Sequence, residues 1–319
     1  MSPPPASRSS SRRRFLVVRA GALGDILLLR PAIDRLLRAG GDVTLLAPRG
    51  AGSVLLGSGI EVLLPWESPE LAPLLLGERL QPWLEEQLQS FDGALAVTRD
   101  QALVEALRKR IPEVARVDPE PPPAVHAGVW FAKAAGTLGA PPEAAAGLER
   151  LRLSYVEDQA AAALAGPLPE AFLAIHPGSG SPRKNWPAER FAALADALSP
   201  RRPFALVAGP ADDQSSAALL ALAPRARVLR ELPLRLLGGV LARAAVYVGN
   251  DSGVSHLAAA FGAPTLALFG PTDPAAWAPL GSLVRTLRGE AGELAAISVA
   301  AAGAVAKALK SEGRALPSG

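Results

Sequence analysis

The sequence predicts an α/β protein built from two doubly wound, Rossmann-like domains. Its 319 residues exceed the size of one ordinary domain. Short apolar segments of β-rich composition alternate with longer segments of helical period, a pattern typical of parallel strands connected by helices. The alternation starts at Phe15 and restarts near Phe172, so we expect two parallel sheets in succession.

Four buried strands are predicted in the first series. Each is a continuous apolar run, as expected for a parallel strand covered on both faces, and each precedes a segment of helical period. The predicted strands are residues 15–19, 43–47, 61–65 and 93–97, and the clearest helical segments are residues 26–39 and 71–89. Within the Pro- and Ala-rich region 112–150, residues 125–138 have helical spacing.

Five more strands and a closing helix are predicted in the second series. The strands are residues 172–176, 204–208, 228–230, 246–249 and 264–270, and the closing helix is residues 297–309. Helices are expected between these strands, at about 187–198, 211–223, 233–243 and 252–261. In such folds ligands bind at the carboxyl ends of the strands, so a cleft between the two domains is the expected site.

The boundary between the domains is expected in residues 155–169, where Ala-rich sequence meets Gly166-Pro167-Leu168-Pro169. We therefore assign residues 15–160 to an N-terminal domain and residues 161–319 to a C-terminal domain.

The excess of positive charge lies in the first fourteen residues. Residues 1–14 contain Arg8, Arg12, Arg13 and Arg14 and no acid, whereas residues 15–319 hold 29 basic and 30 acidic side chains. Pro, Ser and Arg cannot bury apolar surface, so we expect a disordered basic tail. The near-neutral remainder excludes nucleic acid as a partner.

No membrane span or export signal is expected. The longest charge-free stretch, residues 252–272, contains Pro264 and Pro271, which disfavour a spanning helix. Charged residues closely follow the tail and interrupt the apolar run that an export signal needs. We expect a cytoplasmic protein, and the tail suggests peripheral contact with the anionic cytoplasmic face of the inner membrane.

Two residue counts restrict the chemistry. The sequence has no cysteine, which excludes a disulfide scaffold, a thiol nucleophile and a Cys-based zinc site. Its three histidines, at positions 126, 176 and 256, are too few for a His-based metal cage. We expect neither a metal ion nor a cofactor.

The first motif, residues 19–25, connects the first strand to a helix and contains Gly21, Gly24 and Asp25. Glycines allow a tight turn and a close approach to a ligand, and a helix start offers free N–H groups. The G-x-G-x-x-G spacing of dinucleotide sites is absent. Asp25 is either a carboxylate at the mouth of the cleft or a helix N-cap, a role that Asp fills readily.

The second and third motifs also follow predicted strands. In residues 176–187, Ser179 and Gly180 precede Arg183 and Lys184, and a loop of small residues followed by two cations suits a diphosphate. An ordinary solvated loop is the alternative. In the third motif, Asp212 and Asp213 are candidates for binding ribose hydroxyls or for capping a helix.

The fourth motif is the most specific. Asp251, Ser252, Gly253 and His256 combine an acceptor, a hydroxyl, free amides at a helix start and an imidazole. A capped strand-to-helix turn accounts for Asp251 and Gly253 but leaves His256 without a role. A hydrolase triad is disfavoured because the G-x-S-x-G elbow is absent and the acid directly adjoins the serine.

Together these motifs resemble the family 9 glycosyltransferases, the ADP-heptose:lipopolysaccharide heptosyltransferases. The resemblance runs from about Phe15 to Pro279 and rests on GALGD, HPGSG, AGPADD and the block from Asn250 to Pro274. It implies a GT-B fold, with the acceptor in the N-terminal domain and the nucleotide sugar in the C-terminal domain.

The resemblance also implies roles for individual residues. Asp25 matches the catalytic base, and Gly21 and Gly24 lie in the same acceptor-side loop. The residues that match the donor site are Ser179, Gly180, Lys184, Asp212, Asp213, Asp251, Ser252, Gly253 and His256.

We therefore expect an inverting, metal-independent transfer of heptose from ADP-heptose to a sugar hydroxyl of the lipopolysaccharide core. Asp25 would deprotonate the acceptor, and Lys184 with the amides near Ser252 would stabilise the leaving diphosphate. The partners are then a nucleotide sugar and a lipid-linked or other saccharide acceptor. Two alternatives are a nucleotide-sugar transferase with another donor or acceptor, and a nucleotide-sugar-binding protein without turnover. The presence of Asp25 favours an enzyme.

Overall fold

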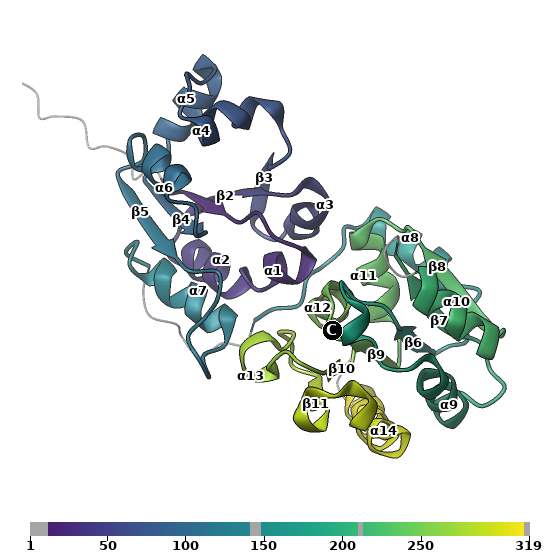
Figure 1. The fold of residues 1–319 in the computed structure, drawn as a ribbon. Coiled ribbons are helices and arrows are strands. Elements are labelled where there is room, and N and C mark those ends of the chain that lie inside the picture. Colours follow the sequence, from purple (N-terminus) through teal and green to yellow (C-terminus); the bar gives the residue numbers. More distant parts are fainter. Residues whose placement is uncertain (1–11, 141–147, 210–212, 316–319) are drawn as a thin grey trace, which may run out of the picture.

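The computed structural model describes residues 12–140, 148–209 and 213–315, which form two parallel sheets, each with helices on both faces (Figure 1). The first sheet has the order β3-β2-β1-β4-β5 and the second the order β11-β10-β9-β6-β7-β8. All described strand pairs are parallel. The predicted α/β class with two doubly wound sheets is confirmed.

The first unit contains the strands β1 (Arg14–Val18), β2 (Asp42–Ala47), β3 (Ile60–Pro65), β4 (Gly93–Val97) and β5 (Glu113–Val117). Its helices are α1 (Leu23–Leu27), α2 (Arg30–Arg38), α3 (Arg49–Gly52), α4 (Ala72–Leu76), α5 (Pro82–Gln89), α6 (Gln101–Arg108) and α7 (Ala127–Gly136), with short 3₁₀ turns η1 (Ser53–Leu55) and η2 (Pro69–Leu71). All of β4 and residues 15–18 of β1 are buried in the middle of the sheet, as their continuous apolar runs predict.

The second unit contains the strands β6 (Leu173–His176), β7 (Phe204–Ala208), β8 (Ala226–Arg230), β9 (Val246–Asn250), β10 (Thr265–Phe269) and β11 (Val284–Arg288). Its helices are α8 (Tyr155–Ala165), α9 (Ala188–Leu198), α10 (Asp213–Leu222), α11 (Leu234–Ala242), α12 (Gly253–Ala260), α13 (Pro274–Trp277) and α14 (Val299–Ala315), with 3₁₀ turns η3 (Pro182–Lys184), η4 (Glu290–Gly292) and η5 (Leu294–Ala296). The closing helix α14 packs on α9, β9 and β10 of the same unit.

The segment expected to be a linker is instead the helix α8. Ser154 caps its start: the Ser154 hydroxyl accepts from the Glu157 backbone N–H, and the Glu157 carboxylate accepts from the Ser154 N–H in return. α8 packs against α11 of the second unit. The predicted boundary at residue 160 therefore falls inside a helix that packs on the second unit.

Residues of the predicted tail divide between the described and the undescribed part of the chain. Residues 1–11 lie outside the described part. Arg14 begins β1, Arg12 lies 3.4 Å from Asp42, and Arg13 pairs with Glu113 at 2.8 Å. These three arginines thus belong to the edge of the first unit.

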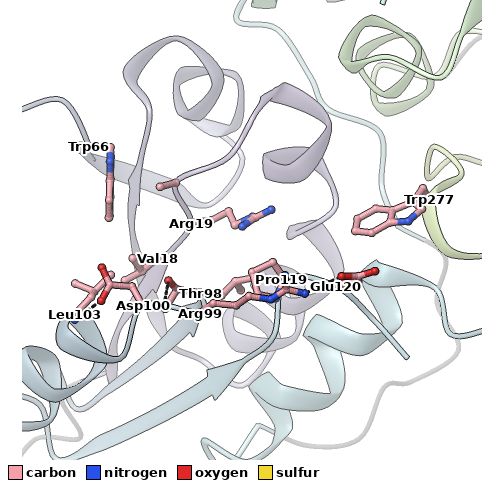
Figure 2. A pocket seen from close by; sticks show the side chains of 12 residues that line it. Val18, Arg19, Trp66, Thr98, Arg99, Asp100, Leu103, Pro119, Glu120 and Trp277 are labelled. Carbon is pink, nitrogen blue, oxygen red and sulfur yellow. Dashed lines mark hydrogen bonds and ion pairs between the residues drawn. The ribbon is translucent and has the colours of Figure 1, made fainter. Parts of the chain in front are cut away.

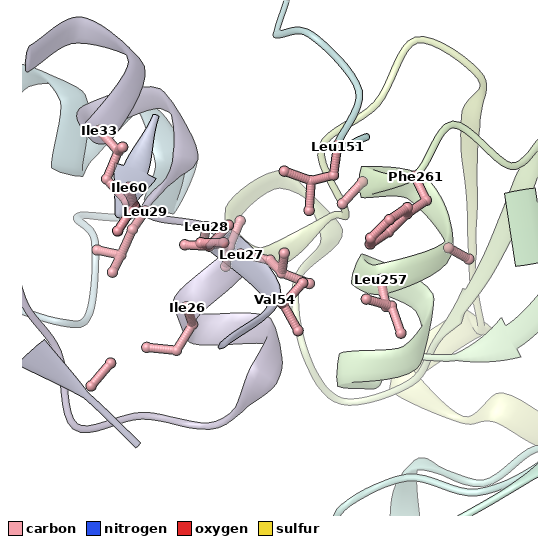
Figure 3. Close-up of a cluster of buried hydrophobic side chains, with 14 of the residues drawn as sticks. Ile26, Leu27, Leu28, Leu29, Ile33, Val54, Ile60, Leu151, Leu257 and Phe261 are labelled. Carbon is pink, nitrogen blue, oxygen red and sulfur yellow. The ribbon is translucent and has the colours of Figure 1, made fainter. Parts of the chain in front are cut away.

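An apolar joint holds the two units together. Leu27 of α1, Leu257 of α12 and Phe261 after α12 are all buried and share one hydrophobic cluster that spans both units (Figure 3). Polar contacts reinforce this joint at its edges. Arg235 of α11 donates to the carbonyls of Val54, at 3.1 Å, and Leu56, at 2.7 Å, in the first unit.

Within the described residues, every helix is too short or too polar to cross a membrane.

Candidate active site

A cavity of about 410 Å³ lies where the strand ends of the two units face each other. Its lining comes from both halves of the chain and consists of Ala22, Gly24, Asp25, Leu28, Gly180, Lys184, Asp251, Ser252, Gly253, His256, Thr272 and Trp277. Eight of the candidate residues from the sequence are in this lining. Because the polar residues follow strands of parallel sheets, the fold places them at the same edge, where such proteins bind ligands.

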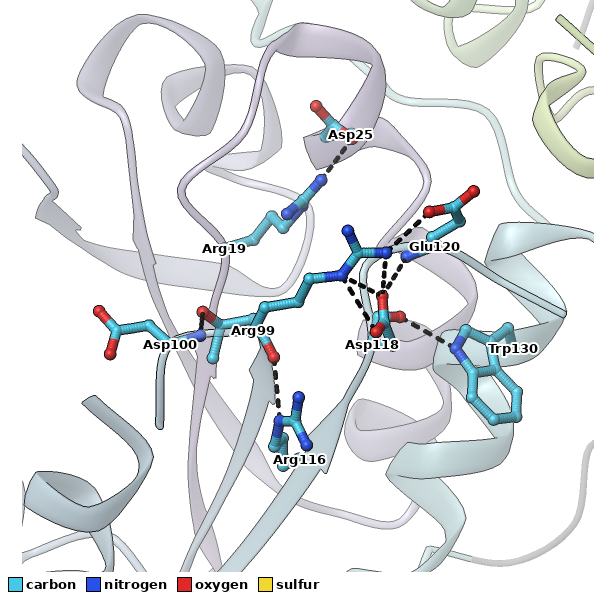
Figure 4. Close-up of polar contacts among 9 residues, drawn as sticks. Arg19, Asp25, Arg99, Asp100, Arg116, Asp118, Glu120 and Trp130 are labelled. Carbon is cyan, nitrogen blue, oxygen red and sulfur yellow. Dashed lines mark hydrogen bonds and ion pairs between the residues drawn. The ribbon is translucent and has the colours of Figure 1, made fainter. Parts of the chain in front are cut away.

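Asp25 lies in the first turn of α1, and both of its carboxylate oxygens are held. Oδ1 accepts from the Arg19 guanidinium at 2.6 Å (Figure 4). Oδ2 accepts from the Ala22 backbone N–H at 2.9 Å. The N-cap residue is Ala22, so Asp25 assists the helix start from within the first turn. Gly21 is required next to it, since a Cβ at Gly21 would lie 2.6 Å from the Asp25 Cβ.

Lys184, at the end of η3, reaches the fourth motif. Its Nζ lies 2.8 Å from the Asp251 carboxylate, which also accepts from the Thr272 hydroxyl at 2.5 Å. The Asp251 side chain is 10% exposed, whereas that of Lys184 is 30% exposed. Each side chain neutralises the other in this structure, and the more accessible one is the cation.

Two buried residues hold the second motif against the fourth. The Asn250 side chain, with no exposed surface, accepts from the Trp186 N–H at 3.0 Å and donates to the Pro177 carbonyl at 2.8 Å. The Trp186 indole in turn donates to the Ile297 carbonyl at 3.1 Å. These contacts fix the loop that carries Lys184.

His256 is buried in the floor of the cavity and faces the first unit. A Cβ at Gly24 would lie 3.2 Å from the His256 Cδ2. The Nδ1 of His256 has no hydrogen-bond partner among the described residues, and burial lowers the pKa of this imidazole to about 4. The side chain is therefore neutral at physiological pH.

Ser252 and Gly253 start α12 at the cavity wall. The Ser252 Oγ lies 3.2 Å from the Nδ1 of His176, at the end of β6. A Cβ at Gly253 would lie 2.9 Å from the Leu23 Cβ. Only a glycine therefore lets α12 approach α1 this closely.

The remaining donor candidates are distributed around the cavity. Ser179 is buried in its loop, with its hydroxyl 2.7 Å from the Asn185 Oδ1, and lines an adjoining cavity of about 360 Å³ that it shares with Gly180. Asp213 begins α10, where its exposed carboxylate pairs with Arg230 at 2.6 Å. Asp212 lies outside the described residues.

A second cavity, of about 390 Å³, adjoins the first on the side of the N-terminal sheet (Figure 2). Trp277 lines both cavities, and Arg19, which pairs with Asp25, lines the second. Other lining residues are Trp66, Thr98, Arg99, Asp100, Pro119 and Glu120. This cavity was not predicted from the sequence. Its residues nevertheless follow the ends of β3, β4 and β5, just as the four predicted motifs follow the ends of other strands.

An ion cluster forms the edge of this second cavity. The Nε of Arg99 donates to the Asp118 carboxylate at 3.0 and 3.1 Å, and its Nη2 donates to Glu120 at 2.7 Å (Figure 4). The hydrogen bond from Arg99 lowers the pKa of Asp118. The described residues contain no cluster of three His, Asp and Glu side chains that could hold a metal ion.

Comparison with curated proteins gives similarity over part of the chain. A segment of 93 residues is 41% identical to lipopolysaccharide heptosyltransferase 1 of Pseudomonas aeruginosa and covers 28% of this chain and 26% of that protein. A segment of 120 residues is 32% identical to lipooligosaccharide heptosyltransferase 2 of Haemophilus influenzae and covers 34% of both. The matches thus span about a third or less of these relatives.

Solved structures match over nearly the whole chain. A family 9 glycosyl transferase from Veillonella parvula has a TM-score of 0.76 at 19% identity, covering 94% of this chain and 97% of that one. The ADP-heptose lipopolysaccharide heptosyltransferase II of Escherichia coli has a TM-score of 0.75 at 20% identity, covering 95% and 100%. These likenesses confirm the expected GT-B fold.

The model of glycosyltransferase family 9 (heptosyltransferase) matches residues 113–300, more than half of the sequence. This chain belongs to glycosyltransferase family 9.

Proposed function

We propose that this protein transfers a heptose from ADP-heptose to a sugar hydroxyl of the lipopolysaccharide core, with inversion at the anomeric carbon. The observation that carries the proposal is the shared cavity, in which the Asp25 carboxylate of one unit meets Lys184 and the α12 start of the other. A base and a diphosphate-binding group on opposite sides of one space are what a single displacement requires. The names of the relatives support heptose as the sugar.

Asp25 acts as the general base in this proposal. Each carboxylate oxygen has two lone pairs, so the contacts with Arg19 and the Ala22 N–H leave acceptor capacity for a sugar hydroxyl. The ion pair fixes the direction of the carboxylate. Because the same ion pair stabilises the charged carboxylate, the proton moves late, once the hydroxyl oxygen has begun to bond to the electron-poor anomeric carbon.

Lys184 and the start of α12 stabilise the departing diphosphate. The Lys184 ammonium is accessible from the cavity, and a helix start offers backbone N–H groups to an anion. A phosphate that approaches Lys184 shares this cation with Asp251. Gly253 and the neutral His256 complete the wall, and Ser179 and Gly180 extend the donor site into the adjoining cavity. Asp213 is exposed and lines neither cavity, and Asp212 lies outside the described residues; both stay donor candidates by their position in the third motif.

Lys184 and the helix start supply the positive charge that a metal ion would otherwise provide, so we propose a metal-independent transfer.

The acceptor sugar enters through the second cavity, which opens beside Asp25 on the N-terminal side. For a lipid-linked acceptor, the reaction takes place at the cytoplasmic face of the inner membrane, with the basic N-terminal segment as the contact. Binding to anionic but not to neutral vesicles tests this contact.

The test of the base is Asp25→Asn, with Asp196→Asn as the matched control. Asp196 is a carboxylate paired with an arginine, Arg225, at 2.7 Å, but its side chain is 70% exposed and far from the cavity lining. We expect the Asp25 variant to lose about 10²–10⁴-fold in transfer rate and to keep its ADP affinity, because the nucleotide residues are in the other unit. Asparagine retains an acceptor for the Ala22 N–H, so a helix-capping role alone predicts little loss.

The readouts are transfer from ADP-heptose to a lipopolysaccharide-core acceptor, ADP binding by calorimetry, and the thermal unfolding temperature. Transfer within a few-fold of the unaltered protein would return Asp25 to a purely structural role. Titration with UDP, GDP and CDP in place of ADP tests the nucleotide. A tighter complex with one of these would replace ADP in the proposal but leave the transfer chemistry intact.

A further inference from the structure

In the proposed function, the acceptor sugar approaches Asp25 through the second cavity. It adjoins the candidate active site through Trp277 and the Arg19–Asp25 ion pair, whose two atoms lie 2.6 Å apart. Its volume of about 390 Å³ lies at the small end of the range for small-molecule sites. An acceptor residue placed there has its hydroxyl next to the proposed base.

Two indole rings flank this space. Trp66 follows β3 of the first unit and Trp277 ends α13 of the second, and both are half-buried. Figure 2 shows them on opposite sides of the cavity, with Arg19 between them. An exposed indole face gains free energy when an apolar surface covers it, and the C–H face of a sugar ring is such a surface.

The cavity contains carboxylates that can accept hydrogen bonds from sugar hydroxyls. Asp100 and Glu120 line it, and Asp118 adjoins it through Arg99. Both arginines of the lining are already paired: Arg19 with Asp25, and Arg99 with Asp118 and Glu120. The cavity lining holds two guanidinium groups and two carboxylates, and both guanidinium groups are already engaged by carboxylates.

This balance of charge works against an acidic sugar. A carboxylate or phosphate entering the cavity has to displace Asp118 or Glu120 from Arg99, or remain near Asp100 and Glu120 without a cation of its own. A neutral sugar has no such cost, because its hydroxyls donate to the carboxylates.

We propose that the acceptor residue that docks beside Asp25 is an uncharged sugar ring, packed against Trp66 and Trp277, and that Glu120 and Asp118 reject acidic sugars. Trp66, Trp277 and Glu120 are then specificity-determining residues for the proposed transfer. The proposal rests on the proposed function only for the direction of transfer, since binding of the sugar is measured separately.

The experiment compares two probes that differ only at C6: methyl α-glucoside and methyl α-glucuronoside. Binding of each to the full chain saturated with ADP is measured by ligand-observed NMR titration. We expect the neutral glycoside to bind at least about tenfold more tightly, because the extra negative charge of the glucuronoside finds both guanidinium groups of the cavity already paired. ADP affinity, measured in the same samples, monitors the donor side.

Two variants with matched controls test the residues. Trp66→Ala weakens binding of the neutral glycoside about tenfold or more, whereas Trp83→Ala, which removes a half-exposed indole on α5 outside the cavity, has no effect. Glu120→Gln narrows the preference for the neutral probe, whereas Glu61→Gln, on the exposed side of β3, leaves it unchanged.

Equal or tighter binding of the glucuronoside, or no detectable binding of either probe, would overturn the inference. With ADP still bound in those samples, the donor half of the proposed function stands. Loss of ADP binding in the unaltered protein would instead count against the proposed function itself.

Discussion

Acidification from pH 7 to pH 5 should destabilise this protein through His256. The imidazole is buried, and burial lowers its pKa to about 4, whereas an unfolded chain has a histidine pKa of about 6.5. Between these two pKa values the unfolded state binds a proton that the folded state does not. The free energy of unfolding therefore falls as the pH falls from 6.5 to 4.

The magnitude follows from these two pKa values. Complete passage through the window costs about 3 kcal/mol, since each unit of pKa difference corresponds to about 1.4 kcal/mol. The step from pH 7 to pH 5 covers most of the window and costs about 2 kcal/mol. Above about pH 7.5 the contribution is constant, because the histidine is then deprotonated in both states.

The assay compares the change in unfolding free energy between pH 7 and pH 5 in the unaltered protein with the same change in a variant. Urea unfolding, followed by tryptophan fluorescence, is measured at pH 7 and pH 5 for the unaltered protein and for His256→Gln, which cannot take up the proton. The unaltered protein should lose about 2 kcal/mol more than the variant. Other titrating groups contribute to both proteins and cancel.

A direct check uses the folded protein alone. The sequence has three histidines, so the imidazole proton resonance that disappears in His256→Gln identifies this residue. Its midpoint should lie near pH 4. A midpoint near 6.5, or identical pH dependence of stability in the two proteins, would refute the reasoning.

Three further outcomes are expected. Lys184→Met should weaken ADP binding by about 1.5–3 kcal/mol, measured by calorimetry. It should also lower the thermal unfolding temperature, because it leaves Asp251 buried without its cation. Adding Asp251→Asn should restore the unfolding temperature but not the ADP affinity. Gly253→Ala should destabilise by about 1–3 kcal/mol, since its Cβ would lie 2.9 Å from the Leu23 Cβ, whereas Gly50→Ala, with nothing within 4 Å, should not. Exhaustive EDTA treatment should leave turnover unchanged, and recovery of lost turnover with Mg²⁺ or Mn²⁺ would contradict the metal-independent mechanism.

Strand prediction succeeded where burial imposes a continuous apolar run and failed at two of the four sheet edges. β5 and β11 were both missed. Each is an edge strand, and its exposed positions carry charged residues such as Glu113 and Arg285 among the apolar ones. Edge strands need fewer apolar residues, and charges there block pairing with other chains, so the local pattern is weak.

The error at α8 has a different cause. The Gly-Pro sequence that suggested a linker follows the helix, and the signal for the helix was the pair Ser154 and Glu157, three residues apart. In the site, the rule that ligands bind at strand ends brought Asp25, Lys184 and Asp251 together correctly. That rule could not predict that Lys184 pairs with Asp251 or that Arg19 pairs with Asp25, because pairing across elements depends on tertiary placement.

The glycines of the first and fourth motifs have a packing role that was not predicted from the sequence. We expected them to admit a ligand, but Gly24 accommodates the His256 ring and Gly253 accommodates Leu23. They allow α1 and α12 to come close, and the apolar joint around Leu27 and Leu257 buries that contact. The same two helices carry Asp25 and the amides of the proposed donor site. The distance between the proposed base and the proposed leaving group is therefore set by helix packing, so a substitution in the joint should alter transfer even where it touches neither substrate.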